Sequence, residues 1–262
     1  MRSHPVRRRL AAMLAAACVV ALAPVPASAS VPAAPVRAAG NRKAYATMGT
    51  PAPRWNPCAP IGYRFNPARA PKGALADVKG AIRRISAATG LKFVYRGTTT
   101  AVPRAKKGYN PDYPANTQLV IAWVHPRKQS EWLPNNQYAG MGGPAWTTGY
   151  TATGKATGLI QWGGVVLNAN LDLAGGFGTG PRYGLQGTRG QLLMHEIGHA
   201  IGLAHPDIQD QQQIMYGTMT RKKAVWGAGD LTGLRLVGAS QGCIRREAVS
   251  AAVVSTRERV LP

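Results

Sequence analysis

Residues 195–205 read His-Glu-Ile-Gly-His-Ala-Ile-Gly-Leu-Ala-His, a stretch with the spacing H-E-x-x-H-x-x-G-x-x-H. Residues four apart on a helix lie on the same face, so His195 and His199 can bind one ion together. Glu196 lies beside that pair, close to the ion but outside its ligand shell, where it can take a proton from a metal-bound water. The stretch therefore predicts a catalytic zinc site on a helix.

A third histidine joins this pair only if the chain turns after His199, because a continued helix would carry His205 to another face. Gly202 can adopt the left-handed conformation that such a turn requires. Pro206 disfavours helical geometry at His205, which leaves that histidine on an extended segment. The pattern thus predicts His195, His199 and His205 as the ligands of a catalytic Zn²⁺, whereas it indicates nothing about Ca²⁺.

Histidine usage favours a metal site over scattered surface histidines. The chain contains five histidines, and three of them belong to the stretch 195–205. His4 falls in the expected signal peptide, which leaves His125 as the only other one. Five specified residues at fixed offsets rarely arise by chance, whereas motifs of two or three residues often do.

At these residues the sequence resembles the metzincin clan of zinc endopeptidases, in which the histidine motif is followed by a turn that contains methionine. Met215 lies ten residues beyond His205, in Ile-Met-Tyr-Gly over residues 214–217. The resemblance implies that Met215 is a structural floor beneath the metal and not a ligand. The Met-Tyr pair and the segment Gly-Asp-Leu-Thr-Gly-Leu over 229–234 are most similar to the matrixin family and its secreted bacterial relatives.

The resemblance implies a zinc metalloendopeptidase that hydrolyses internal bonds of a polypeptide substrate. Zinc would activate a water, and Glu196 would act as general base and then deliver the proton to the leaving amine. Residues 139–146 would precede or form an edge strand that aligns the peptide by backbone pairing, with a plain surface loop as the alternative. Asp230 would brace the turn at Met215, although an N-terminal helix cap also accounts for it.

Two other functions remain open from the sequence. One is a secreted, basic, zinc-containing binding protein attached to anionic cell-wall polymers, which would have no need of Glu196. The other is a zinc hydrolase of cell-wall peptides. Asp207 and Asp210 follow the third histidine closely, and either can orient a ligand histidine, but exposed carboxylates on a loop are the simpler interpretation.

Several departures from matrixins affect this interpretation. Only a short segment separates the expected signal cleavage site from Trp55, so we expect no folded pro-domain whose cysteine blocks the zinc. With His125 as the only spare histidine, a second, structural zinc is not expected. The link over 206–213 is slightly longer than usual and Gly217 stands where a proline is expected, which alters the predicted specificity pocket.

The N-terminus has the pattern of a secretory signal peptide. Arginines within the first nine positions precede an apolar run over residues 10–23, and Ala-Ser-Ala over 27–29 offers a cleavage site. The run is too short to span a membrane. We therefore expect a signal peptide over 1–29, with twin-arginine export as an alternative route, and a secreted, extracellular monomer without a membrane segment.

Cysteine usage predicts a disulfide. Signal cleavage removes Cys18 and leaves Cys58 and Cys243, and two cysteines in an exported protein most simply form one disulfide. Closing so long a loop stabilises by up to about 5 kcal/mol in the chain-entropy model. The alternative is that Cys58 is a thiol that blocks the zinc, which would leave Cys243 unpaired.

The chain carries a formal net charge of +22. Such a charge favours anionic surroundings such as cell-wall polymers or acidic proteins. The basic residues are dispersed and no nucleic-acid-binding motif is present, so we expect no specific nucleic-acid partner. Solvated faces are the simpler account of these charges.

Four parts are expected along the chain. After the signal peptide, residues 30–54 are rich in alanine, proline and arginine and predict a flexible leader. Residues 55–245 have the length of one catalytic domain, and 246–262 form a C-terminal tail. We classify the fold as α+β, a single metzincin-like domain with a twisted, mostly parallel sheet, an antiparallel edge strand, two long helices and a C-terminal helix.

Local patterns predict the elements of this domain. Leu75, Val78, Ile82 and Ile85 recur at helical spacing, and Gly90 provides a stop. The strand, helix, strand order around this helix implies a right-handed crossover and parallel strands. We expect strands over 61–65, 91–95, 119–124 and 164–167, helices over 188–203 and 229–237, and long loops over 97–116 and 169–190.

Overall fold

The structure is a computed structural model, and it describes residues 37–104, 112–246 and 252–253. The expected signal peptide lies outside the described residues, and so does most of the expected tail. The helices are α1 (Ala74–Thr89), α2 (Arg189–Ala200), α3 (Ala228–Val237) and a short 3₁₀ helix (Ala239–Gln241). The strands are β1 (Ala46–Thr47), β2 (Ile61–Asn66), β3 (Phe93–Thr98), β4 (Leu119–Val124), β5 (Gly140–Thr151), β6 (Ala156–Asn168), β7 (Leu203–Ala204), β8 (Ile244–Arg246) and β9 (Ala252–Val253).

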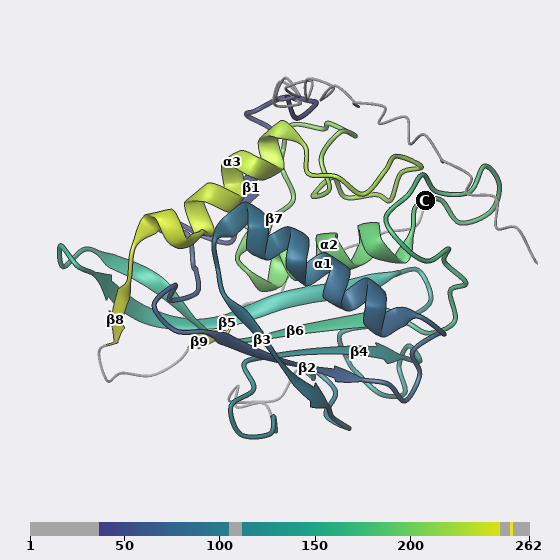
Figure 1. The fold of residues 1–262 in the computed structure, drawn as a ribbon, viewed down its shortest axis with the longest axis horizontal. Helices are drawn as coiled ribbons and strands as arrows, with labels where there is room; N and C mark the ends of the chain where they lie inside the picture. The colour runs from purple at the N-terminus through teal and green to yellow at the C-terminus, as the bar shows by residue number, and fades with distance from the viewer. Residues whose placement is uncertain (1–36, 105–111, 247–251, 254–262) are drawn as a thin grey trace, which may run out of the picture. The chain divides into compact units, whose positions relative to one another are not determined.

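The main sheet is mixed. Its strands follow the order β3-β2-β4-β6-β5-β8, and β9 also pairs with β5. Strands β3, β2, β4 and β6 are mutually parallel, whereas β5 runs antiparallel to β6, β8 and β9. Figure 1 shows α1, α2 and α3 on the same side of this sheet. The expected α+β class, with parallel strands and an antiparallel strand towards one edge, agrees with this arrangement.

The first helix forms as its apolar spacing predicts. Val78, Ile82 and Ile85 are buried, and each fully buried aliphatic side chain contributes roughly 1.5–3 kcal/mol relative to exposure. The helix ends at Gly90, whose φ of 72° is the left-handed conformation that ends a helix most easily in glycine. This helix connects parallel strands β2 and β3, so it forms the expected crossover.

The sheet is covered on both faces, which explains the uninterrupted apolar sequence of β4. All six residues of this central strand are buried. Some belong to the large core beneath the helices, whereas Ala122 and Val124 belong to a second cluster with Trp132 and Leu133. A strand buried on both faces is typical of parallel sheets.

The hairpin of β5 and β6 is much longer than the sequence predicted. Only residues 164–167 were expected as a strand there, but β6 spans Ala156–Asn168 and β5 spans Gly140–Thr151. Both strands contain several glycines, which have low strand propensity and conceal the pattern. The segment expected to precede or form an edge strand, 139–146, contains the first half of β5.

Residues 37–54 differ from the flexible leader that their composition predicted. Strand β1 pairs antiparallel with β7, and the Met48 N–H donates to the carbonyl of Gly202 at 2.9 Å. The side chains of Ala44 and Met48 are buried. The segment is held by backbone pairing and by single buried side chains, neither of which produces a periodic sequence. In the structure the domain therefore begins before Trp55.

The beginning and the end of the domain are joined covalently. Cys58 and Cys243 form a disulfide, with Cα atoms 5.5 Å apart and a sequence separation of 185. The predicted pairing is confirmed, and the alternative of Cys58 as a free thiol over the metal is wrong. Next to the disulfide, the buried guanidinium of Arg54 donates to the carbonyls of Gln241 and Gly242.

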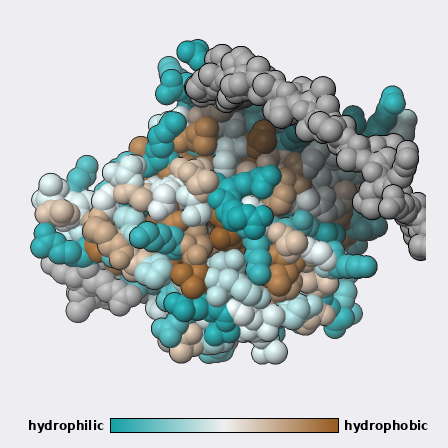
Figure 2. All heavy atoms as spheres, in the orientation of Figure 1, coloured by the Kyte–Doolittle hydropathy of each residue, from teal (hydrophilic) through white to brown (hydrophobic). Residues whose placement is uncertain are grey.

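Hydrophilic and apolar residues are intermixed on the face seen in Figure 2. Among the described residues, Tyr183 and Val225 are the most exposed of the large apolar ones, at 79% and 62%. No helix among the described residues is long and apolar enough to cross a membrane.

Candidate metal centre

Helix α2 places the histidine motif in the centre of the domain. Thr188 caps its start, because the threonine hydroxyl accepts from the Gln191 N–H at 3.3 Å. Every residue from Gly190 to Ala200 is buried. The helix therefore presents His195, Glu196 and His199 inside the protein rather than on an open surface.

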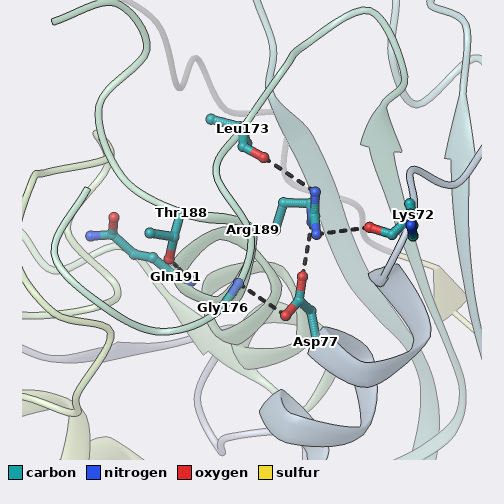
Figure 3. A network of polar contacts seen from close by, with 7 residues as sticks. All are labelled: Lys72, Asp77, Leu173, Gly176, Thr188, Arg189 and Gln191. Atoms are coloured by element: carbon teal, nitrogen blue, oxygen red, sulfur yellow. Dashed lines mark hydrogen bonds and ion pairs between the residues drawn. The ribbon is translucent and has the colours of Figure 1, made fainter. Parts of the chain in front are cut away.

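A charged network fixes the beginning of α2 (Figure 3). The Arg189 Nε donates to the Asp77 carboxylate at 2.9 Å, and both side chains are largely buried. The remaining guanidinium nitrogens donate to the carbonyls of Leu173 and Lys72, and the other carboxylate oxygen accepts from the Gly176 N–H. The network joins α1, the glycine-rich loop over 169–190 and α2. The sequence prediction missed it, although an aspartate on the apolar face of α1 was an available signal.

The three predicted ligands converge. The Nε2 atom of His195 lies 3.1 Å from that of His199 and 2.9 Å from that of His205. One ligand atom from each histidine lies within 4.8 Å of the others. His195 and His199 are buried, whereas His205 is half-buried, so one side of the cluster is accessible.

Backbone carbonyls determine which ring nitrogens face the centre. The Nδ1 of His195 lies 2.7 Å from the carbonyl oxygen of Ile214, and the Nδ1 of His199 lies 2.9 Å from that of Leu203. A carbonyl only accepts, so each Nδ1 carries its hydrogen, and Nε2 is the nitrogen left to face the centre. Such contacts from the outer nitrogen are usual for histidines that bind a metal.

The donor set fits a zinc ion. Lone pairs of neutral imidazoles at about 3 Å repel one another unless a cation lies between them. Zinc binds imidazole nitrogen at about 2.0–2.1 Å, so tetrahedral ligands lie about 3.3 Å apart, close to the separations observed here. Three histidines with one accessible side fit a zinc site that keeps one coordination position open.

The turn after α2 forms as the sequence predicts. Gly202 has a φ of 108°, and a Cβ atom there would overlap the carbonyl of Pro53. Strand β7 (Leu203–Ala204) follows at once and pairs with β1, so His205 leaves the end of a strand. The third predicted ligand is therefore positioned by pairing with a segment about 160 residues earlier in the chain.

Met215 lies directly beneath α2. Its side chain is buried, and a Cβ atom added to Gly198 would lie 2.5 Å from its sulfur. The neighbouring Ile214 carbonyl is the partner of His195. The resemblance implied a floor beneath the metal, and Met215 lies under the helix turn that joins two of the three histidines.

Asp230 makes both of the contacts that the sequence suggested for it. Its carboxylate accepts from the N–H groups of Ile214 at 2.6 Å and Met215 at 3.1 Å, which braces the methionine turn. It also accepts from the Gly227 N–H at 2.8 Å, at the start of α3. Burial raises the pKa of this carboxyl to about 6, because the three backbone donors and nearby His195 offset only part of the desolvation.

The hydrogen bonds of Asp210 join it to the N-terminal segment and to its own loop, and none of them reaches one of the three histidines. Its carboxylate accepts from the Asn41 N–H at 2.6 Å, from the Gln212 N–H at 2.9 Å and from the Gln213 amide at 2.7 Å. Burial acts to raise the pKa of Asp210, but these bonds and the charge of Lys222 outweigh it and hold the pKa below its ordinary value. Asp207 is exposed.

Glu196 lies between α2 and β5. Its side chain is 2% exposed, and a Cβ atom on Gly140 would lie 2.7 Å from its Oε1. A Cβ atom on Gly142 would overlap the Glu196 backbone carbonyl. The absent side chains of these two glycines let the first half of β5 approach the helix closely, so the carboxylate lies against this strand.

Comparison with known proteins does not assign the chain to a family. No protein-family model matches the chain, and a search of curated proteins gives no match. Among solved structures the chain is similar to high choriolytic enzyme 1 (HCE-1), a hatching enzyme zinc-protease from Oryzias latipes, the medaka fish. The two share 15% sequence identity over 58% of this chain and 50% of that one, so the chain spans about half the length of that protein. The TM-score of 0.27 is too low to support either a fold or an activity.

Proposed function

We propose that the protein is a secreted zinc-dependent endopeptidase of the metzincin type, matrixin-like in its methionine turn. One observation carries the proposal: three histidine Nε2 atoms converge, two of their outer nitrogens are held by carbonyls, and a glutamate follows the first histidine on the same helix. The signal-peptide pattern and the Cys58–Cys243 disulfide support export.

Each group of the site has a role in peptide hydrolysis. Zinc, when bound, would polarise the scissile carbonyl and lower the pKa of a water. Glu196 would accept the proton of that water and pass it to the leaving amine. Its burial against Gly140 excludes bulk water from one side of the carboxylate and restricts its orientation.

The first half of β5 is suited to hold an extended peptide. It lies against Glu196, and a peptide paired with its outer edge would be aligned by main-chain hydrogen bonds whatever its side chains. Basic residues dispersed over the surface favour acidic substrates or anionic wall polymers as surroundings.

The decisive experiment separates catalysis from zinc binding. We expect Glu196→Gln to retain one zinc per chain by metal analysis and to lose at least about a hundredfold in kcat on a peptide library, within the usual range for a general base. Glu131→Gln, at an exposed carboxylate, is the matched control and should keep full activity. A chelator should abolish activity, and added zinc should restore it.

The other outcomes identify the alternatives. Zinc bound by the wild-type chain, with no cleavage of proteins or peptides at any pH, would support a zinc-containing binding protein instead. Cleavage confined to cell-wall peptides would support the wall hydrolase.

A further inference from the structure

A polar cavity lies where strands β4 and β6 end and β5 is about to begin. His125 directly follows β4, Asn170 lies shortly after β6, and Asn135 and Asn136 lie shortly before β5. The cavity has a volume of about 580 Å³, and these four residues line it together with Arg127 and Lys128. Ligands often bind beyond the carboxyl ends of parallel strands, and β4 and β6 are parallel neighbours.

Hydrogen bonds between distant segments fix the walls of this cavity. An amide oxygen only accepts, so the His125 Nδ1–H donates to the side-chain oxygen of Asn170, at 2.7 Å. The Asn170 amide in turn donates to the side-chain oxygen of Asn136 at 2.9 Å. The buried side chain of Asn168 donates to the Tyr138 carbonyl and accepts from the Asn170 N–H. The ends of β4 and β6 and the segment before β5 are therefore held together as one site.

Arg127 is held in a backbone conformation that arginine rarely adopts. Its φ of 64° lies in the left-handed region, which is unfavourable for a residue with a Cβ atom. Its N–H donates to the Leu133 carbonyl at 2.8 Å, and its Nε donates to the Pro134 carbonyl at 2.6 Å. These bonds orient the guanidinium at the cavity, where it stays exposed. Unfavourable backbone conformations that the surroundings enforce are common at functional sites.

The chemistry of the lining indicates an anionic ligand. Arg127 and Lys128 are exposed and carry positive charges, and the asparagine side chains offer neutral amides. Among the described residues that line the cavity there is no carboxylate, and the nearby Glu131 and Asp172 do not line it. A divalent cation would therefore lack the anionic ligands that it prefers. A carboxylate, in contrast, forms strong charge-assisted hydrogen bonds with arginine and lysine.

The cavity lies within reach of the strand that contacts Glu196. Asn136 lies four positions before Gly140, a span of at most about 14 Å. A Cβ atom on Gly140 would lie 2.7 Å from the Glu196 Oε1. A peptide that extends along the first half of β5 and past Gly140 would therefore reach the cavity within about four residues of the bond beside Glu196.

We propose that this cavity is a subsite for a glutamate or aspartate side chain of the polypeptide substrate. The inference rests on the proposed function and names its substrate class, which is segments with an acidic residue about two to four positions from the cleaved bond. Arg127 and Lys128 donate to the carboxylate, on the side of the peptide that runs past Gly140. The formal net charge of +22 adds a general attraction for acidic chains.

The first test measures binding without cleavage. The zinc-loaded Glu196→Gln variant is titrated with tetraglutamate that is capped at both ends, and with capped tetraglutamine as the uncharged control. NMR follows the side-chain amide signals of Asn135, Asn136 and Asn170. Tetraglutamate is expected to shift these signals, whereas tetraglutamine is not. Signals that tetraglutamate leaves unchanged would overturn the proposal.

Matched charge variants separate the cavity from the general charge of the chain. Lys128→Gln removes a charge at the cavity, whereas Lys155→Gln removes one from an exposed lysine in the turn between β5 and β6. We expect Lys128→Gln to weaken tetraglutamate binding about fivefold, at the upper end for an exposed ion pair, and Lys155→Gln to have no effect. Equal effects of the two substitutions would show a nonspecific attraction, and the proposed subsite would be wrong.

A phosphate polymer tests a different occupant of the same cavity. Polyglycerol phosphate is titrated into the same zinc-loaded variant. If it shifts the three asparagine signals and tetraglutamate does not, the cavity binds an anionic wall polymer and the substrate subsite is refuted.

Cleavage then tests the preference. Library peptides that differ only by glutamate or glutamine at one position are compared by kcat/KM. We expect the wild type to prefer glutamate about fivefold at a position about two to four residues from the cleaved bond. Lys128→Gln should lose this preference, and Lys155→Gln should keep it. Cleavage without the preference contradicts the subsite and leaves the proposed function intact. A chain that binds tetraglutamate at the cavity but cleaves no peptide contradicts the proposed function instead.

Discussion

The two ends of helix α2 are held in different ways. At its beginning, a buried ion pair between Arg189 and Asp77 joins α2 to α1 by side chains. At its end, the chain turns at Gly202 and is held by backbone pairing of β7 with β1. The predicted ligands on the helix, His195 and His199, therefore depend on local helical geometry and one charged anchor. The third ligand, His205, depends on a short strand from the beginning of the domain.

Breaking the charged anchor should have the largest effect. Asp77→Ala leaves the Arg189 guanidinium buried without its partner, and we expect a loss of about 3–5 kcal/mol in the free energy of unfolding. Denaturant unfolding measures it. The double variant Asp77→Ala/Arg189→Met removes both charges and should recover most of the loss. A single variant as stable as the wild type would show that the network does not anchor α2.

Disrupting the turn at Gly202 should lower stability by less than loss of the ion pair does. It should also displace His205 and so weaken zinc binding. Gly202→Ala introduces a Cβ at positive φ and against the Pro53 carbonyl, so we expect more than the roughly 1–2 kcal/mol of a left-handed residue alone. Gly154→Ala is the matched control, because Gly154 has a φ of 80° but no atom within 4 Å of the added Cβ. Zinc affinity, measured by competition with a chelator, should fall for Gly202→Ala only.

Acidification should weaken the contacts of the N-terminal segment that holds the C-terminal end of α2. We expect this to be the smallest of the three effects on stability. The pKa of Asp210 is lower in the folded protein than its ordinary value, so its contribution to stability is present above the ordinary carboxyl pKa. It is lost as the pH falls through the folded-state value. The Asn41 amide proton, bonded to this carboxylate, should report the transition by NMR. Asp210→Asn should remove this component of the pH dependence, and an unchanged profile would contradict the assignment.

The features that could be predicted from the sequence are those that depend on local geometry. The spacing of the histidines and the position of Gly202 require only helix geometry and one backbone conformation, and the structure agrees with both. The helix over 74–89 carries its own periodic signal. Each of these features is encoded by residues close together in the chain.

The features that the sequence did not predict depend instead on contacts between distant parts of the chain. Residues 37–54 are ordered by backbone bonds to β7 and to Asp210, and such bonds leave no pattern of side chains. The length of the β5–β6 hairpin was hidden by glycines, two of which are required by the close approach of α2. Long-range contact therefore decided the elements that local propensity could not indicate.

The disulfide between Cys58 and Cys243 makes a closed covalent ring of almost the whole domain. A single cut in any loop between them leaves one molecule and not two. The fragments stay tethered at high effective concentration, so their paired strands can re-form before either piece diffuses away. The domain would thus tolerate one nick in its own backbone.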